Sequence, residues 1–237
     1  MYLKKLLSIV TVVFNEREAV SSTIKSIIKN KSDEIEYLVI DGGSTDGTLE
    51  IINQYRDSID LIISERDQGI YDAMNKGIKH SQGYYILNIN CGDVLLINPL
   101  TYLRRSHFVG NAYDLILFNV KQSNGRLFIN QLSKKMKFRN TLHHQGVLYR
   151  TDKKKLYDLN YKVFSDFDYN QRLFKSGSSS LKIEAVICTH DLGGVSHSKV
   201  SFSENYKIIV SNFGYCYLVI ALIYYKIQGL KARLIYN

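Results

Sequence analysis

The first part of the chain alternates between short apolar runs and segments with helical spacing. The runs have the length of buried strands, and in the segments between them apolar residues recur every three or four positions. We predict strands at 6–14, 35–40, 59–64 and 84–89, and helices at 16–29, 48–55 and 70–79. Strands that alternate with helices in this way form right-handed βαβ units. The pattern therefore predicts an α/β fold built on a parallel sheet.

The second part of the chain is less regular. It contains predicted strands at 114–120 and 181–188, and a short predicted helix at 167–175 that ends near Gly177. Asn124-Gly125 favours a hairpin turn because both residues accept a positive φ. The N-terminal residues lead directly into a strand and show no cleavage site, which is not typical of a signal peptide.

A polar loop follows each of the four predicted strands, at 15–16, 41–47, 65–69 and 90–93. Ligands of open parallel sheets bind beyond the carboxyl ends of the strands. In the second loop, Asp41 can accept hydrogen bonds from a ribose or a base, and Ser44 to Asp46 can cap the next helix. A capped turn without ligand is the alternative for this loop. Loops are commonly polar, which would explain any one of the four, but four in succession on one edge favour a binding site.

Composition narrows the class of partner. The 237 residues carry a formal net charge of +9, which suits nucleic acid, an anionic membrane surface or a phosphorylated substrate. No zinc-finger spacing or nucleic-acid motif accompanies this charge, so we predict no nucleic-acid partner. Three widely spaced cysteines, Cys91, Cys188 and Cys216, are typical of free thiols in a reducing compartment. The catalytic part is therefore expected in the cytoplasm.

Four ordered motifs carry a resemblance to a known family. TVVFNE (11–16), DGGSTDGT (41–48), DQGIYDAMNKG (67–77) and NCGD (90–93) resemble glycosyltransferase family two, whose members are inverting enzymes with the GT-A fold. The resemblance is strong over residues 5–100 and continues weakly through HHQ (143–145), SDFD (165–168) and GGVS (193–196). It is strongest to bacterial enzymes that build O-antigen, capsule or other exopolysaccharide. The sequence has no GxSxG elbow, which argues against a serine hydrolase. It also has no GxGxxG loop and no P-loop lysine, which argues against a nicotinamide dehydrogenase and a P-loop NTPase, respectively.

The resemblance implies a nucleotide-sugar site along the first half. Asp41 would hold the base, and Arg66 and Asp67 would border the ribose and the diphosphate. The other residues expected to line or adjoin this nucleotide pocket are Thr11, Phe14, Glu16, Tyr71 and Asn75.

A divalent metal, Mn²⁺ or Mg²⁺, is also implied. Asp93 would occupy the metal-binding position of the aspartate motif, where a hard cation neutralises the leaving diphosphate. Asn90 and Gly92 stand where many members have carboxylates, so Asp93 is the only acid of this motif. His190 is a candidate second ligand, with a structural histidine as the alternative.

An inverting transfer needs one general base to deprotonate the acceptor hydroxyl. Asp166 matches the catalytic position of the family's acidic pair, and Asp168 is its competitor two residues later. Either residue could instead cap the helix that follows. His144 and Gln145 are expected on the acceptor side, with a neutral buried role as the alternative.

The C-terminal segment has a different character. Residues 208–225 contain no charge over 18 positions, which as a helix gives about 27 Å, the lower limit for crossing a bilayer. Lys226, Lys231 and Arg233 follow among apolar residues, a mix that favours an interfacial helix on anionic lipid. Packing on the catalytic domain, or across a homodimer, is the alternative.

We therefore predict a GT-A catalytic domain at 1–200, with a nucleotide-sugar half (1–100) and an acceptor half (101–200), followed by C-terminal helices at 201–237. It would move a sugar from a UDP-sugar to a lipid-linked saccharide acceptor, as a peripheral protein on the inner face of the cell membrane. Two alternatives stay open. A sugar nucleotidyltransferase would carry a Gly-rich basic loop in place of residues 15–18, and a non-catalytic nucleotide-sugar-binding subunit would bind UDP without turnover.

Overall fold

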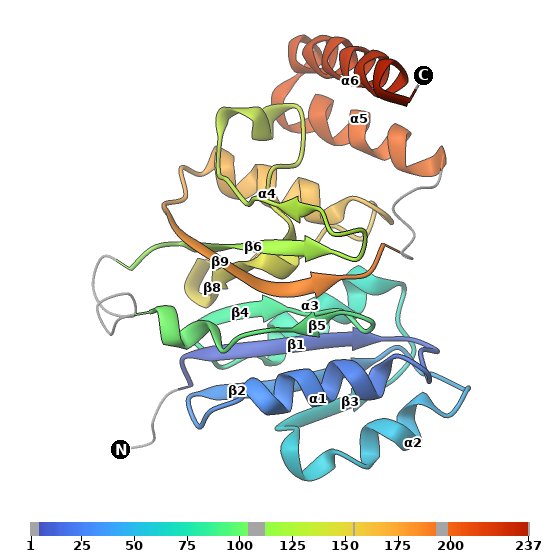
Figure 1. Ribbon diagram of the computed structural model, residues 1–237, viewed down its shortest axis with the longest axis vertical. Coiled ribbons are helices and arrows are strands. Elements are labelled where there is room, and N and C mark those ends of the chain that lie inside the picture. Colours follow the sequence, from blue (N-terminus) through green and yellow to red (C-terminus); the bar gives the residue numbers. More distant parts are fainter. Residues whose placement is uncertain (1–4, 104–111, 154, 193–198, 237) are drawn as a thin grey trace.

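A mixed sheet runs through the protein in the computed structural model, which describes residues 5–103, 112–153, 155–192 and 199–236. The strand order is β3-β2-β1-β4-β8-β6-β9-β5, and β7 pairs with β6 (Figure 1). The strands are β1 (Leu7–Val13), β2 (Ile35–Asp41), β3 (Leu61–Ser64), β4 (Tyr85–Asn88), β5 (Val94–Leu95), β6 (Leu115–Gln122), β7 (Leu127–Phe128), β8 (Val147–Arg150) and β9 (Ser180–His190).

The first four strands and their helices confirm the predicted βαβ pattern. β1 pairs in parallel with β2 and β4, and β2 pairs in parallel with β3. The connecting helices are α1 (Val20–Asn30), α2 (Thr48–Asn53) and α3 (Ile70–His80). The first helix begins four residues later than predicted, because Asn15 has a positive φ and residues 16–19 form a turn.

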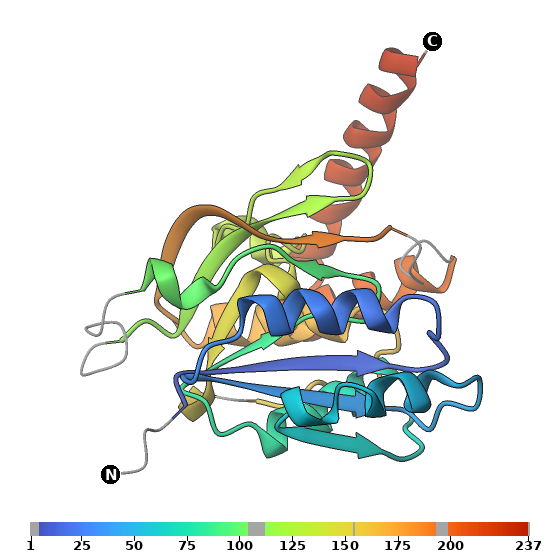
Figure 2. The ribbon, with the colours of Figure 1, turned by 60° about the horizontal axis from the view of Figure 1, so that its bottom comes forward.

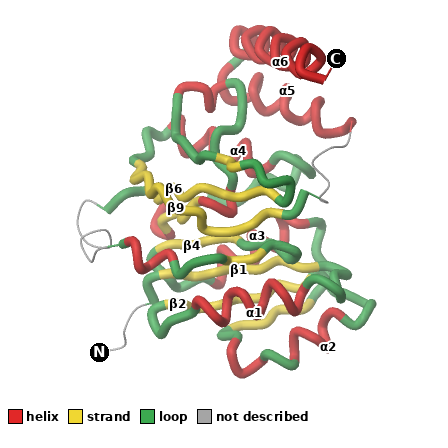
Figure 3. The backbone as a smooth tube through the Cα atoms, viewed as in Figure 1, coloured by secondary structure: helices red, strands yellow, loops and turns green. Residues whose placement is uncertain are grey.

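Alternate side chains of the strands enter two separate cores. On β1, Val10 and Val12 pack with α3 on one face, whereas Leu7 and Ile9 pack with α1 on the other. Figure 3 shows the strands in yellow with helices on both sides. β1, β2 and β4 are buried at every position, which explains why they are continuous apolar runs, whereas the edge strand β3 is only partly buried.

The second half adds antiparallel pairs to the parallel sheet. β8 pairs in antiparallel orientation with β4 and β6, and the two-residue β5 pairs with the end of β9. The predicted hairpin turn at 123–126 joins β6 to β7, with Gly125 at a φ of 83°. Helix α4 (Ser165–Lys175) packs beside α5, and Gly177 beyond it has the positive φ expected at a helix end.

Two helices form the C-terminal end of the molecule, far from α2 (Figure 1). They are α5 (Lys199–Phe213) and α6 (Tyr215–Tyr236), separated by Gly214 at a φ of 84°. The uncharged run 208–225 is therefore divided between two helices. Figure 2 shows α6 projecting away from the body. No helix in the described part of the chain is long and apolar enough to cross a membrane.

Candidate active site

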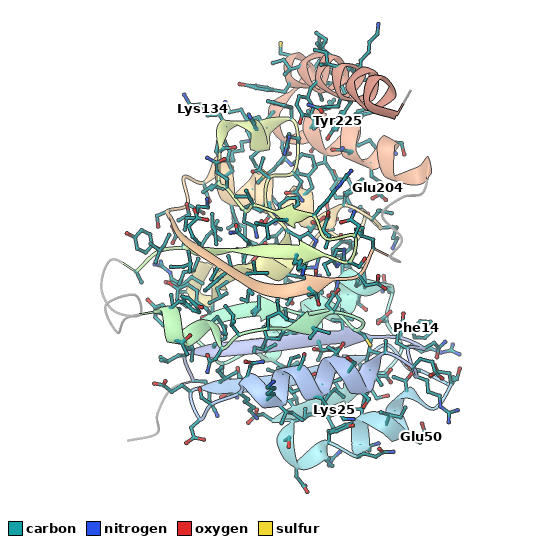
Figure 4. All side chains as sticks on the ribbon, in the orientation of Figure 1. Phe14, Lys25, Glu50, Lys134, Glu204 and Tyr225 are labelled. Carbon is teal, nitrogen blue, oxygen red and sulfur yellow. The ribbon has the colours of Figure 1, made fainter. Side chains whose placement is uncertain are left out.

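The loops after β1, β2 and β3 meet at the carboxyl edge of the sheet, where Figure 4 labels Phe14. The Phe14 ring is 57% exposed, which is unusual for a large aromatic side chain. Gly42 lies between this ring and the carboxylate of Asp67, and a Cβ at Gly42 would collide with that carboxylate. The exposed ring and the Asp67 carboxylate thus lie side by side because residue 42 has no side chain.

The loop after β2 is locked by hydrogen bonds within itself and to the loop after β1. Ser44 Oγ donates to the Asp41 carboxylate and accepts the backbone N–H of Asn15 at 2.8 Å. The Asn15 side chain in turn accepts the N–H of Thr45 at 2.9 Å, and Glu16 N–H donates to Thr48 Oγ1 at 2.9 Å. A hydrogen bond from Thr48 lowers the pKa of Asp46. These bonds fix the first two loops against each other.

Two of the predicted nucleotide residues lie below this surface. Thr11 is fully buried within the sheet and accepts a hydrogen bond from the Tyr37 hydroxyl at 3.2 Å. Asp41 is also fully buried, and its oxygens accept hydrogen bonds from Ser44 and Ser64. Thr11 lies within β1 and Asp41 is the last residue of β2, so both side chains support the loops at this edge from inside the sheet. Glu16, Arg66 and Phe14 are exposed on the edge, and Asp67 is half-buried.

Tyr71 and Asn75, on α3, face the second half of the molecule. Asn75 holds the backbone of Tyr157, donating to its carbonyl at 3.0 Å and accepting its N–H at 2.8 Å. The Tyr71 hydroxyl donates to the Val163 carbonyl at 2.7 Å and lies 3.3 Å from Asp166 Oδ1. Burial, reinforced by the Asp166 charge, raises the pKa of Tyr71 well above its usual range. Tyr71 therefore remains a proton donor beside that carboxylate.

Asp93 and His190 come together from positions 97 residues apart. His190 Nδ1 lies 3.1 Å from Asp93 Oδ1, which also accepts the N–H of Asp191 at 2.9 Å. The strand pairing brings them together, because Asp93 directly precedes β5 and β5 pairs with the end of β9, at Val94 and Thr189. Asp93 is 3% exposed. The predicted pair of metal ligands thus shares one buried corner of the edge.

The donor groups in this corner suit a hard divalent cation. The Gln145 side chain contacts the second oxygen of Asp93, and the amide oxygens of Gln145 and Asn90 are buried without hydrogen-bond partners. Carboxylate and amide oxygens with an imidazole nitrogen fit Mg²⁺ or Mn²⁺. Among the described residues no group of three or more His, Cys, Asp or Glu side chains gathers. Amide oxygens would therefore have to complete the ligand set beside Asp93 and His190.

Asp166 lies in the first turn of α4 at the centre of several polar contacts. Its Oδ2 accepts from Asn140 Nδ2 at 3.1 Å and lies 3.7 Å from His144 Nδ1. With the Tyr71 hydroxyl on Oδ1, both carboxylate oxygens face hydrogen-bond donors. The side chain is 14% exposed, so the carboxylate is oriented but still open to solvent.

Asp168 has a different environment. It is 5% exposed and pairs with Arg172 on the same helix at 2.7 Å. Its other oxygen accepts from Asn212 Nδ2 of α5 at 3.0 Å. Both oxygens thus stabilise the helix and its packing on α5, and this carboxylate has little contact with solvent.

The histidines link the two acidic positions. His144 Nε2 lies 3.3 Å from Asn90 Nδ2. The His143 ring stacks on that of His144 and meets that of His190 edge-on, at centroid distances of 5.5 and 4.6 Å. Burial lowers the pKa of His143 well below its usual range, so its ring is neutral. His144 and Gln145 therefore stand between Asp93 and Asp166, as part of one continuous polar cluster.

Two residues in this region belong to none of the sequence motifs. Asn140 contacts Asp166, and Glu204 on α5 accepts the backbone N–H groups of Lys162, Val163 and Phe164 at 2.8, 2.8 and 3.2 Å. Glu204 is 8% exposed. It holds the segment that enters α4 just before Asp166. The predicted GGVS motif (193–196) lies outside the described residues.

Comparison with known proteins gives the family and the fold of this chain. A model of the family "Glycosyl transferase family 2" matches residues 8–180. A PGL/p-HBAD biosynthesis glycosyltransferase of Mycobacterium bovis is 28% identical over 205 residues, covering 81% of this chain and 80% of that protein. The putative teichuronic acid biosynthesis glycosyltransferase TuaG of Bacillus subtilis is 30% identical over 93 residues, covering 38% of this chain and 37% of TuaG.

Two solved structures share the fold. S. aureus TarS 1-349 in complex with UDP-GlcNAc has a TM-score of 0.70 at 18% identity, covering 87% of this chain and 66% of that one. Mannosyltransferase PcManGT from Pyrobaculum calidifontis, in complex with GDP-Man and Mn²⁺, has a TM-score of 0.65 at 12% identity, covering 100% of this chain and 81% of that one. At these identities the likeness concerns the fold, which is the predicted GT-A type.

Proposed function

Since the chain belongs to glycosyl transferase family 2, we propose that it is an inverting, metal-dependent transferase that moves a sugar from a UDP-sugar to a lipid-linked saccharide. Its family and its relatives place it among the glycosyltransferases of polysaccharide biosynthesis. The observation that carries the finer proposal is the cluster in which Asp93 and Asp166 lie on one edge, joined through Asn90 and His144.

Asp166 is the proposed general base. It takes the proton of the acceptor hydroxyl while that oxygen forms its bond to the anomeric carbon, on the face opposite the departing nucleoside diphosphate. Asn140 donates to one oxygen of the carboxylate, and the Tyr71 hydroxyl, whose proton is shared between the Val163 carbonyl and Asp166, borders the other. Asp168 is less suited to this role because Arg172 and Asn212 occupy its oxygens.

The donor nucleotide is proposed to bind along the loops after β1, β2 and β3. The exposed Phe14 ring offers a face for the base, and Arg66 and Asp67 border the ribose and diphosphate. Asp41 acts indirectly, since it fixes Ser44 and through it the loop that supports Phe14 and Asn15. The donors seen with the two structural neighbours, UDP-GlcNAc and GDP-Man, differ in their base, so the uridine of this proposal needs a direct test.

Asp93 and His190 are proposed to hold the divalent metal, together with amide oxygens of Asn90 and Gln145. When bound, such a cation neutralises the charge that develops on the leaving diphosphate. The pairing of β5 with β9 keeps both side chains in place before donor arrives.

The outer face of α6 is proposed to rest on an anionic membrane surface on the cytoplasmic side. Val219, Ile223 and Ile227 are 55, 56 and 46% exposed, and Lys226 is exposed beside them. The exposed Lys134 lies on the turn next to α6, where Figure 4 labels it. Lysines that flank an apolar helix face complement acidic lipid headgroups. Side chains of Lys231 and Arg233 lie outside the described set.

Vesicle flotation tests this membrane placement. The wild type should float with phosphatidylglycerol vesicles more than with phosphatidylcholine vesicles, and the Val219→Asp, Ile223→Asp double variant should lose this binding. The alternative is a homodimer. It would be assigned to this face if both proteins floated equally and the wild type sedimented as a dimer while the double variant did not.

The catalytic proposal is tested by a panel of UDP- and GDP-sugars, with Mn²⁺, Mg²⁺ or EDTA. We expect nucleoside diphosphate release with one UDP-sugar, inversion at the transferred anomeric carbon, and loss of both in EDTA. Release of pyrophosphate from UTP and a sugar 1-phosphate, supplied in a separate reaction, would identify a nucleotidyltransferase. UDP binding without turnover on any acceptor would identify a non-catalytic binding subunit.

A further inference from the structure

A cavity lies on the side of Asp166 that faces the C-terminal helices. Its volume is about 350 Å³, within the range of ligand pockets. The wall combines the 139–140 segment, the start of α4, one residue of α5 and the described part of α6. The lining residues are Arg139, Asn140, Phe164, Phe167, Asn205, Tyr224, Tyr225 and Gln228.

Arg139 gives this cavity a positive charge that no acid within the described residues neutralises by an ion pair. Its guanidinium donates to the Tyr224 hydroxyl and lies over the Tyr224 ring, 5.3 Å from the centroid. The side chain is half-buried. A guanidinium has five N–H donors in a planar fork, so most of its hydrogen-bonding capacity is left for an anion.

The rest of the lining is mainly aromatic. Phe164, Phe167 and the rings of Tyr224 and Tyr225 surround the cavity, and Gln228 adds an amide. Such a wall suits apolar chains and sugar faces rather than a small hydrated ion. The cavity thus combines one cation with a predominantly apolar surface, which is the chemistry of an amphiphilic anion.

The cavity borders both the proposed base and the proposed membrane face. Asn140, in its wall, donates to Asp166 Oδ2 at 3.1 Å. Tyr224 and Tyr225 occupy the inner side of α6, whereas Ile220 and Ile223 of the same helix are exposed outside. Figure 4 shows Tyr225 between α6 and the body, near Glu204. A molecule in this cavity would therefore lie between the lipid surface and the carboxylate.

We propose that this cavity is a binding site for the phosphate-bearing lipid part of the acceptor, with Arg139 on the phosphate and the aromatic wall on the first carbons of the lipid chain. The proposal rests on the proposed function, because it places the acceptor's saccharide toward Asp166. It makes α6 a part of the acceptor site as well as a membrane contact.

Octyl phosphate serves as the probe, because it joins a short apolar chain to a phosphate without a sugar. Saturation-transfer NMR on the full chain, without donor, should detect binding to the wild type. Arg139→Gln should weaken it about tenfold or more, since a charge-assisted bidentate contact is lost. Arg139→Lys should weaken it less, and Lys25→Gln, a charge change on the exposed face of α1, should leave it unchanged. Circular dichroism verifies that each variant is folded.

Two further probes, each with one half of octyl phosphate, show how much the chain and the phosphate contribute to binding. Octanol and inorganic phosphate should each bind at least tenfold more weakly than octyl phosphate, because each lacks one half of the recognised chemistry. The proposal would be overturned if octanol or inorganic phosphate bound as tightly as octyl phosphate. It would also be overturned if Arg139→Gln bound octyl phosphate with the wild-type affinity.

Vesicles distinguish the acceptor from a membrane headgroup. Arg139→Gln should float with phosphatidylglycerol vesicles as the wild type does, because the outer face of α6 makes that contact. Loss of flotation in Arg139→Gln, with octyl phosphate binding intact, would assign Arg139 to a headgroup and overturn the acceptor site. Since no donor is present in these measurements, a failure of the transferase proposal would appear separately, as absent turnover in the donor panel.

Discussion

The donor and acceptor sides of the proposed site are held together in different ways. On the donor side, hydrogen bonds join residues of two neighbouring loops, such as Ser44 with Asp41 and with the N–H of Asn15. On the acceptor side, side chains hold distant backbone segments: Asn75 binds Tyr157, and Glu204 binds residues 162–164 from about 40 positions away. Both sides are ordered, but the donor side joins two loops of one sheet edge, 29 residues apart for Asn15 and Ser44, whereas Asn75 and Tyr157 are 82 residues apart.

This difference has a consequence for stability and activity. The donor loops follow strands of the parallel sheet, so their geometry is fixed by elements close in sequence. The entry to α4, which carries Asp166, depends on α5 through Glu204 and on α3 through Tyr71. Changes on the donor side should therefore alter nucleotide affinity alone. Changes on the acceptor side should alter turnover and folding stability together.

The largest expected effect is that of Asp93→Asn, at the boundary between the two sides. Among the described residues Asp93 supplies the one carboxylate of the proposed metal corner. Its loss should lower kcat roughly 10²–10³-fold, since a bound cation contributes several kcal/mol to the stabilisation of the leaving group. Steady-state rates across a Mn²⁺ titration measure this. Asp57→Asn, an exposed carboxylate on the short turn before β3, is the matched control. A fully active Asp93→Asn protein would remove Asp93 from the metal site.

Glu204→Gln should give the next largest effect. One neutral amide oxygen replaces two charged oxygens that accept three backbone N–H groups, which should cost about 1–3 kcal/mol of unfolding free energy. Urea denaturation measures the loss, and kcat should fall while the KM for the donor is unchanged. Glu50→Gln, exposed on α2 at the other end of the molecule (Figure 4), is the control. A change in donor KM with kcat intact would contradict a positioning role.

Ser44→Ala tests the donor side and should have the smallest effect. The change removes one hydroxyl that bridges Asp41 and the Asn15 N–H, worth about 1 kcal/mol, so UDP affinity should fall roughly fivefold. Calorimetric titration with UDP measures it, with Ser22→Ala on the exposed face of α1 as control. If kcat falls as strongly as affinity, the two sides are not separate.

The donor side was largely predictable because its signals are local. Each apolar run became a strand of the parallel sheet, and each polar loop appeared at a strand end. The burial of single side chains was harder to predict, because the register of a strand decides which face a residue near its carboxyl end, such as Thr11 or Asp41, points to.

The acceptor side was less accessible to sequence reasoning. β5 has two residues, too few for a periodic pattern, although it brings Asp93 to His190. β8 is as long as β3 and β4, but the segment between β7 and β8, which the structure describes throughout, holds short 3-10 turns and no α-helix, so no strand–helix alternation marks it. Asn140 and Glu204 stand in segments without motifs, and their partners are 26 and about 40 residues away. Gly214 divides the uncharged run into two helices at a φ of 84°. A glycine at this position is itself a sequence signal for a helix end, because glycine readily adopts a positive φ.

The central claim is that donor binding and acceptor deprotonation reside on separate sides, with Asp166 as the base. Asp166→Asn tests it most directly, by calorimetric titration with UDP and Mn²⁺ beside an assay of sugar transfer. We predict that UDP affinity stays within about twofold of wild type, while transfer falls by at least roughly 10²-fold, the usual contribution of a general base. Transfer that persists at the wild-type rate in Asp166→Asn, or UDP binding lost together with transfer, would contradict the account.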